Sequence, residues 1–588
     1  MINRLQSLVF TACMLSAWSA GAVDAVDTHV LETNPLDKIA QQNLSEDDYI
    51  GDVPKVLTVS RLAQSKEDSP SAVTVIDSAT IRASGIVDIP ELFRLVPGFY
   101  VGKNAGYIYN SNHVVSYHGM ASAYAGAMQV LINGRSVYSP LYGGINWSEL
   151  PITVDDIDRI EITRGPNAAS YGANSFFGVI SIITKDTKDS TGSSVRLTHG
   201  TGRNEAFYRY GGALNDVNFR VSAGYREDDG LDNRNDFKRT NILNLQADKR
   251  IDARNEINLE LGITNGDRAD GEAARDKTLF VPRTRDILNH YELIHWRHSI
   301  GEDSDFSLQA FHSSNSSDDK ITSVNLRPGI TAAVFNIEYA KEYKKARQLG
   351  LSDKAAKKLA TQLATPLALA AGNSLLADGI AIDNDIDLER YDIEAQHTFT
   401  LYDNLRFVWG GNIRLDTTYA PHWLGTGETD YFNLQRLFGH VEWRMNDHFL
   451  VNIGSMVEHN SFTGTDVSPR ASLNFKLTPN HALRFGVSTA TRTPNDIEEK
   501  FNDVTVIPTS TATTYILQNY ASQGKEDPER IVSKEIGYLG QIGNLNIDAK
   551  VFYDDVSQIL NTERPNFALP STTVLLSKKL TKKLYQCC

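Results

Sequence analysis

Residues 156–172 read DIDRIEITRGPNAASYG, and residues 178–185 follow as GVISIITK. Both stretches are rich in isoleucine and other β-branched residues, which predicts two short strands. An Arg-Gly-Pro turn at Arg164 and a Tyr-Gly turn at Tyr171 lie between them. Taken alone, the segment predicts a small mixed domain whose strands are joined by tight turns.

The length and charge of the chain limit its class. A chain of 588 residues predicts two or more units. A formal net charge of -14 argues against nucleic-acid binding, which needs a clustered basic face. Outside the first 22 residues there is no apolar run long enough for a membrane-spanning helix, which excludes a protein built from many such helices.

The N-terminus has the pattern of a secretory signal peptide over residues 1–22. Arg4 gives the positive region, an apolar stretch follows, and small residues end at Ala22. Removal of this peptide leaves two adjacent cysteines at the C-terminal end, so no disulfide framework is expected. Residues 23–54 are polar and acidic, which predicts a flexible periplasmic segment.

After residue 186 apolar and polar residues alternate in segments of about ten residues. Residues 217–225, 257–263, 405–415 and 449–457 are examples. Alternation of this kind is typical of strands that face lipid on one side and an aqueous lumen on the other. A soluble β-sandwich would also alternate.

The opening stretch strongly resembles the plug domain of TonB-dependent outer-membrane receptors. Residues 89–98 (IPELFRLVPG) and 129–137 (QVLINGRSV) resemble other parts of that plug, and the similarity is dense from about residue 54 to 185. Residues 468–494 and 528–553 resemble barrel segments of the same receptors. The resemblance implies a mostly β fold, a transmembrane antiparallel β-barrel occluded by an N-terminal α/β plug.

The resemblance also implies the order of the parts. They are a signal peptide (1–22), a flexible periplasmic segment (23–54), a plug (55–186), a barrel (187–570) and an aberrant tail (571–588). Residues 331–381 depart from the strand pattern. Two helical patterns there, separated by Gly350 and Ser352, predict a helical insertion in an extracellular loop.

The C-terminal end departs from the family. Its members usually close the barrel with a strand that ends in Phe or Trp, and residues 571–588 lack such a strand. We therefore expect an incomplete barrel, with about 16 to 18 strands of about 22. This leaves two functional alternatives: an active receptor, or a truncated, non-transporting surface binding protein or inactive remnant.

The sequence contains no catalytic motif for nucleophilic, metal-dependent or phosphate chemistry. The fourteen histidines are scattered along the chain, so neither a metal site nor a cofactor is expected. The chain is therefore not expected to be an enzyme.

The expected partner inside the cell envelope is the energy-transducing protein TonB. A short β-prone segment in polar surroundings is suited to add as an edge strand to that partner, as the TonB box does in the family. The candidate residues are Val56, Leu57, Thr58, Val59 and Ser60. The alternative is that they form an ordinary first strand of the plug.

Two plug loops match the apical loops that meet ligand in the family. They are rich in aromatic residues, which offer flat faces with polar tips. The ligand-binding candidates are Tyr107, Tyr109, Asn110, Asn112, Tyr138, Tyr142 and Trp147. The alternative is that these aromatic residues pack the plug against the barrel wall.

In the family, the arginine of the Arg-Gly-Pro turn pairs with barrel glutamates inside the lumen. Here the resemblance assigns this role to Arg164, with Glu535 as the expected partner. A second plug arginine of the family is replaced by His118, which puts a second lock in doubt.

These expectations combine into one hypothesis: a monomeric receptor in the outer membrane lipid that imports a ferric siderophore, or a similar large nutrient, with energy from TonB. Haem or another iron complex is the alternative substrate. Haem receptors usually carry a nearby ligand histidine, and the corresponding residues 490–494 (ATRTP) contain none.

Overall fold

The computed structural model divides the chain into two units, Met1–Val53 and Pro54–Cys588, and only the second contains described residues. The structure describes residues 56, 58–105, 112–118, 126–270, 282–323, 326–377, 379–478, 480–507, 510, 514–522, 524–543, 545–560 and 573–577. Among these residues, no helix has both the length and the apolar character needed to cross a membrane.

The N-terminal part of this unit is a mixed domain built on a five-stranded sheet, which we call the plug. Its strand order is β1-β6-β7-β4-β5, in which β6 is antiparallel to β1 and β7, and β4 is parallel to β7. The strands are β1 (Ala72–Asp77), β4 (Met128–Ile132), β5 (Arg135–Ser136), β6 (Ile157–Arg164) and β7 (Gly178–Thr184). The two strands predicted from the opening stretch, β6 and β7, are confirmed, and they pair with each other.

Short helices and a second small sheet complete the plug. They are α4 (Ser78–Ser84), η1 (Ile89–Leu95), η2 (Trp147–Glu149), η3 (Val154–Asp156) and α5 (Ala168–Tyr171), with β2 (Phe99–Gly102) paired to β3 (Val114–Tyr117). The side chain of Asp77 accepts a hydrogen bond from the Thr80 amide (2.7 Å) and so begins α4. Leu92, Phe93 and Ile160 are fully buried in the core between η1 and the sheet.

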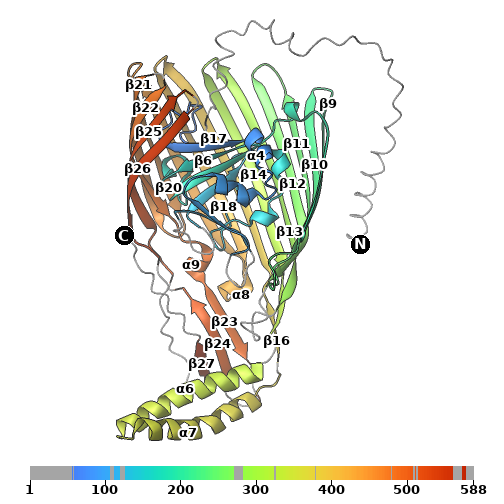
Figure 1. Cartoon of the computed structure of the whole chain (residues 1–588), viewed down its shortest axis with the longest axis vertical. Helices are drawn as coiled ribbons and strands as arrows, with labels where there is room; N and C mark the ends of the chain where they lie inside the picture. Colours follow the sequence, from blue (N-terminus) through green and yellow to red (C-terminus); the bar gives the residue numbers. More distant parts are fainter. Residues whose placement is uncertain are drawn as a thin grey trace, which may run out of the picture. The chain divides into compact units, whose positions relative to one another are not determined.

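A fifteen-stranded antiparallel sheet follows the plug and curves beside it (Figure 1). Its strands are β8 (Gly192–Gly200), β9 (Arg203–Leu214), β10 (Val217–Asp228), β11 (Lys238–Arg250), β12 (Asn255–Asp270), β13 (Arg283–Gly301), β14 (Ser304–Asp318), β17 (Ile386–Tyr402), β18 (Leu405–Tyr419), β19 (Asp430–Arg444), β20 (Phe449–Asn460), β21 (Gly464–Thr478), β22 (His481–Arg492), β25 (Glu529–Ile542) and β26 (Leu545–Ser557). Each strand pairs with the next in this order.

The two faces of this sheet differ in the way the sequence predicted. On β12, Leu259 and Leu261 are exposed on the outer face, whereas Glu260 and Thr264 are buried on the inner face. Hydrogen bonds between plug and strand residues, such as Asn133 Nδ2 to Glu260 Oε1 (2.8 Å), place the plug against the inner face. An apolar outer face and a polar inner face are typical of a membrane barrel.

The sheet does not close: within the described residues, β8 and β26 are its two edges and do not pair with each other. It contains fifteen strands, where the sequence predicted about 16 to 18. β27 (Thr573–Ser577) lies outside it, in a small sheet with β23 (Asn502–Ile507) and β24 (Thr514–Ala521).

Connections of unequal length give the sheet two different ends. Turns of a few residues, such as 302–303, 403–404 and 445–448, define the short-turn end. The long-loop end carries the pair β15 (Lys320–Ser323) and β16 (Ile380–Asp383), α8 (Pro421–Leu424) and α9 (Asp496–Lys500). It also carries the helical insertion, α6 (Leu326–Gln348) and α7 (Asp353–Asn373), in which buried alanines such as Ala346 and Ala360 let the two helices approach closely.

The open sheet predicts weak resistance to detergent. Unpaired backbone groups along β8 and β26 cost several kcal/mol each in hydrocarbon. We therefore expect the refolded 588-residue chain to migrate in SDS gels at one position, whether or not the sample is heated. A closed receptor barrel, run beside it as a control, should shift on heating; a shift of the same size in this chain would contradict the open sheet.

Candidate functional site

The Arg-Gly-Pro turn at the end of β6 contacts the last strands of the sheet. Nη2 of Arg164 lies 2.5 Å from Oδ2 of Asp548 on β26, and Arg164 is buried. Nζ of Lys550, on the same strand, donates to the Arg164 carbonyl oxygen (2.9 Å). The charged lock between plug and sheet is therefore present in this structure.

The partner that we expected for Arg164 is wrong in this structure. Glu535, on β25, accepts from Nε of Arg484 (3.0 Å) and from Nζ of Lys550 (3.3 Å). These two cations occupy both of its oxygens, so Arg164 pairs with Asp548 one strand further along. Glu535 still belongs to the same cluster, because it holds the lysine that contacts the turn.

Glycines at both turns of the opening stretch allow the plug to approach charged groups of the sheet. Gly165 has φ +114°, and a Cβ atom there would lie 3.2 Å from Nζ of Lys550. Gly172 has φ +76°, and a Cβ atom there would overlap the ion pair between Arg436 and Glu458. The Ala173 amide donates to that same Glu458 carboxylate (3.1 Å). The sequence of the turns thus fits the charged groups that they touch.

His118 makes no ion pair with any described residue. It follows β3 with a positive φ of 56°, and its ring lies against Tyr117 and Phe552, with ring centroids 3.8 and 4.8 Å away. Phe552 is on β26. His118 therefore contacts the sheet through aromatic packing rather than charge.

The candidate TonB box is buried in this structure, whereas we expected an accessible segment. Val56, Thr58, Val59 and Ser60 are each about 1% exposed, and Leu57 lies outside the described residues. The Thr58 amide and hydroxyl donate to Oε2 of Glu161 on β6 (3.0 and 2.5 Å). The segment packs on the plug because valine and threonine favour burial as much as strand pairing.

Residues 58–69, which we call the strap, bind the sheet near its short-turn end. Arg61 Nη2 donates to Oε2 of Glu394 on β17 (3.1 Å), and its guanidinium lies 4.1 Å from the Phe438 ring centroid. Asp68 pairs with Arg444 (2.9 Å) and Lys476 (2.7 Å), which flank two short turns. The strap therefore joins the N-terminal side of the plug to the sheet.

The described ligand-binding candidates are mostly buried. Trp147 packs on Phe93 in the plug core, and the Tyr138 hydroxyl donates to the Gly126 carbonyl (2.7 Å). Tyr142 packs beside Leu388 and Leu424. These aromatic residues have the packing role that was the alternative to ligand contact, at least in this state.

The remaining candidates lie in the other apical loop. Tyr107, Tyr109 and Asn110 are outside the described residues. Asn112 is buried; its side chain donates to Asn146 (2.6 Å) and accepts from Nη1 of Arg268 (2.8 Å). Arg268 also pairs with Glu149, so Asn112 is tied to β12.

Sequence reasoning missed a buried polar network between the plug and the long-loop end. Lys103 pairs with Asp228 (2.9 Å), and Asn104 donates to Asp236 (2.8 Å) and accepts from Lys238. Burial, together with the nearby Lys238 ammonium, lowers the pKa of His113 to about 3, so its neutral Nδ1 accepts from the Asn104 amide. More than a hundred residues separate each pair of plug and sheet partners, so no local sequence pattern could reveal them.

A second contact joins the plug to α9, in the connection between β22 and β25. The Asp496 and Ile497 amides donate to the Pro140 and Leu141 carbonyls of the plug (3.1 and 3.0 Å). The Asp496 carboxylate is buried and accepts from the Thr418 hydroxyl (2.5 Å). Burial raises the pKa of Asp496 to about 7.

The lock predicts that Asp548→Asn loosens the plug. The substitution leaves the buried Arg164 guanidinium without its anion; because Asp548 is one-third exposed, we expect a loss of about 1–3 kcal/mol. Faster hydrogen exchange of the β6 and β7 amides would report it. Asp555→Asn, on the outer face of the same strand, is the matched control, and equal protection in the two variants would contradict the lock.

The α9 contact predicts a pH dependence. The folded pKa of Asp496, about 7, lies above the unfolded value, so the folded state holds the extra proton and this contribution to stability falls as the pH rises from about 4 to about 7. After correction for intrinsic rates, the Ile497 amide should exchange faster above pH 7 than below it. Asp496→Asn should remove this dependence, and a wild-type amide that is insensitive to pH would contradict the prediction.

Comparisons with known proteins agree with this architecture. Residues 65–179 match the family model for the TonB-dependent receptor plug domain, and residues 154–574 match that for the TonB-dependent receptor-like β-barrel. The fold is similar to the siderophore receptor PirA from Acinetobacter baumannii, with a TM-score of 0.60 and 16% identity, covering 84% of this chain and 71% of that one.

Curated relatives are more distant or shorter in overlap. The iron-regulated outer membrane virulence protein of Vibrio cholerae serotype O1 (strain O395) is 21% identical over 460 residues, 75% of this chain and 60% of that protein. The vitamin B12 transporter BtuB of Vibrio vulnificus (strain CMCP6) is 26% identical over 200 residues, 34% of this chain and 31% of that protein. The chain thus spans less than two thirds of either relative.

These relatives are transporters and receptors, and the chain is not an enzyme. The barrel model alone covers more than half of the sequence, and the plug model covers the part before it. The chain belongs to the TonB-dependent receptor family.

Proposed function

We propose that this protein lies in the outer membrane and imports a ferric siderophore, or a related large iron complex, with energy supplied by TonB. The observation that carries the proposal is the plug held against the inner face of the sheet by charged contacts. The apolar outer face supports a membrane location.

The closed state supports a transport step that needs mechanical work. A cavity lined by Arg135, Tyr138 and Arg390, between plug and sheet, has a volume of about 50 Å³, room for water but not for a siderophore. Passage therefore requires the plug to move. The outer membrane has no nucleotide supply or ion gradient, so the work has to arrive through a partner.

The strap is the proposed point at which force enters. It lies at the short-turn end and contacts both β6 and the sheet, so tension on residues 56–60 would reach the Arg61–Glu394 pair and Glu161 first. In this proposal Val56, Leu57, Thr58, Val59 and Ser60 leave their buried site and add as a strand to TonB.

Ligand contact is proposed for the apical loop with Tyr107, Tyr109, Asn110 and Asn112. The bond from Arg268 to Asn112 would carry a change in this loop to β12. Tyr138, Tyr142 and Trp147 would reach a ligand only after the plug moves, because all three are buried. Partners other than TonB and the ligand are not required, and we propose a monomer.

Iron is favoured over cobalamin by the extent of the similarity. The relative named for iron regulation aligns over 75% of this chain, whereas the B12 transporter aligns over 34%. An alignment over most of the chain includes sheet and loops, where substrates are selected.

Uptake in a Gram-negative host without its own siderophore and cobalamin receptors tests this function. Cells that express the full chain should accumulate labelled iron from ferric siderophores, and deletion of TonB should abolish the uptake. Accumulation of cobalamin alone would overturn the iron assignment. Ligand binding without uptake would support the alternative of a non-transporting surface binding protein.

The position of the TonB box needs a separate variant. Val59→Pro removes a backbone donor and should abolish uptake while ligand binding at the cell surface stays intact. Val59→Ala, the matched control, loses the same packing but keeps the donor, so it should retain uptake. Normal uptake by Val59→Pro would show that TonB binds elsewhere, without affecting the iron assignment.

A further inference from the structure

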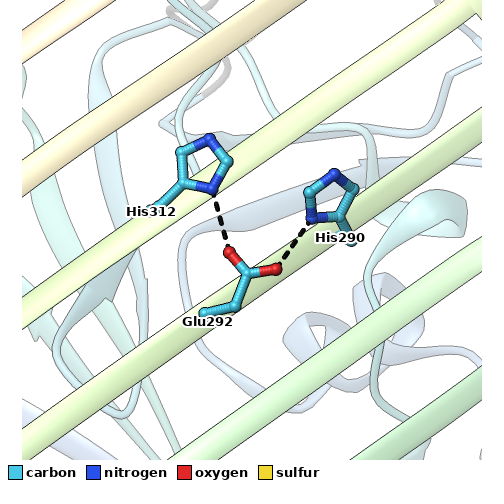
Figure 2. A group of neighbouring side chains, drawn as sticks. All are labelled: His290, Glu292 and His312. Atoms are coloured by element: carbon cyan, nitrogen blue, oxygen red, sulfur yellow. Dashed lines mark hydrogen bonds and ion pairs between the residues drawn. The ribbon is translucent and has the colours of Figure 1, made fainter.

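A cluster of two histidines and one glutamate lies on the outer face of the sheet, away from the plug. Figure 2 shows His290 and Glu292, both on β13, with His312 on the neighbouring β14. Residues 290 and 292 share one face because side chains alternate along a strand, and the register pairs Glu292 with His312. Three potential metal ligands therefore meet on a rigid surface.

We propose that this cluster is a binding site for a borderline divalent metal ion, with Zn²⁺ as the probe of choice. Nδ1 of His290 and Nδ1 of His312 lie 3.0 and 2.9 Å from the two oxygens of the same Glu292 carboxylate. One ligand atom from each residue lies within 4.8 Å of the others. Two imidazoles and a carboxylate are a common ligand set for Zn²⁺.

The geometry requires only small side-chain rotations. Zn²⁺ binds histidine nitrogen and carboxylate oxygen at about 2.0–2.2 Å, which places tetrahedral ligand atoms about 3.4 Å apart. The strands need not move, because the three side chains already converge. Three protein ligands on a partly exposed surface leave a fourth position for water.

A neighbouring strand holds one of the ligands in place. The His312 ring stacks on Tyr391 of β17, with centroids 4.6 Å apart and an interplanar angle of 21°. The Tyr391 hydroxyl donates to Glu389 (2.9 Å). Support of this kind around a ligand ring is typical of metal sites, where outer contacts set the ring orientation.

The position on the sheet explains why a cation is favourable there. The cross-strand row below the cluster, toward the short turns, contains Ile294, Ala310 and Ile393, and the row that includes His290 contains Ser314 and Glu389. The cluster thus lies where the outer face changes from apolar to polar. A carboxylate at a lipid boundary is costly unless a cation neutralises it.

The same contacts could be explained by hydrogen bonds alone, with each imidazole donating to Glu292. That reading requires no metal, and it predicts that the cluster binds protons only. The experiment below separates the two readings.

Zn²⁺ titration of the untagged full chain in detergent, after removal of metal by a chelator, tests the site. A chromogenic chelator as competitor should report one Zn²⁺ per chain, and Co²⁺ in place of Zn²⁺ should give visible d–d absorption. His290→Ala and His312→Ala should each weaken binding at least about tenfold, the loss that removal of even an outer contact can cause.

His459→Ala is the matched control, because His459 is an exposed histidine on another strand of the same sheet. It should bind Zn²⁺ like the unchanged chain. Glu292→Gln keeps the size of the side chain and should also weaken binding, which distinguishes lost ligation from lost folding. Absence of one-to-one binding, or equal affinity in the His290→Ala and His459→Ala variants, would overturn the proposal.

Discussion

Buried charge between the plug and the sheet is the constraint on which this structure depends. The inner face of the sheet is polar, so every charged group that the plug covers needs a partner there. Arg164 meets Asp548, Arg61 meets Glu394, and Arg268 meets Glu149. Breaking a buried pair costs about 3–5 kcal/mol, whereas forming it gains little over hydration. Such pairs therefore fix the position of the plug more than they stabilise it.

This distinction suits a plug that has to move. Contacts with a small net free energy but high specificity hold one closed state and can reform after opening. Glycines at the two turns of the opening stretch bring the plug backbone close to Lys550 and to the Arg436–Glu458 pair. The strap links these contacts to the short-turn end, where the proposed partner would pull.

The sequence was sufficient to predict features with a local signal. The strands at 157–164 and 178–184 follow from β-branched residues, and the alternation on β12 follows from its period of two. Choices that depend on neighbours far along the chain could not be predicted. Both Glu535 and Asp548 lie near the Arg164 turn, and only the positions of Arg484 and Lys550 decide between them. The burial of Val59 was missed because valine suits both a buried site and an exposed strand, and the His290–Glu292–His312 cluster depends on the register of β13 with β14.

The central claim is that the strap transmits force to charged contacts that hold the plug. Single-molecule pulling on the full chain in a membrane, with a handle attached at residue 54, tests it most directly. The account predicts an early rupture as the strap leaves the sheet, followed by stepwise extension of the plug, and a lower early rupture force in Arg61→Ala. A single extension of the whole plug, with a rupture force unchanged in Arg61→Ala, would contradict it.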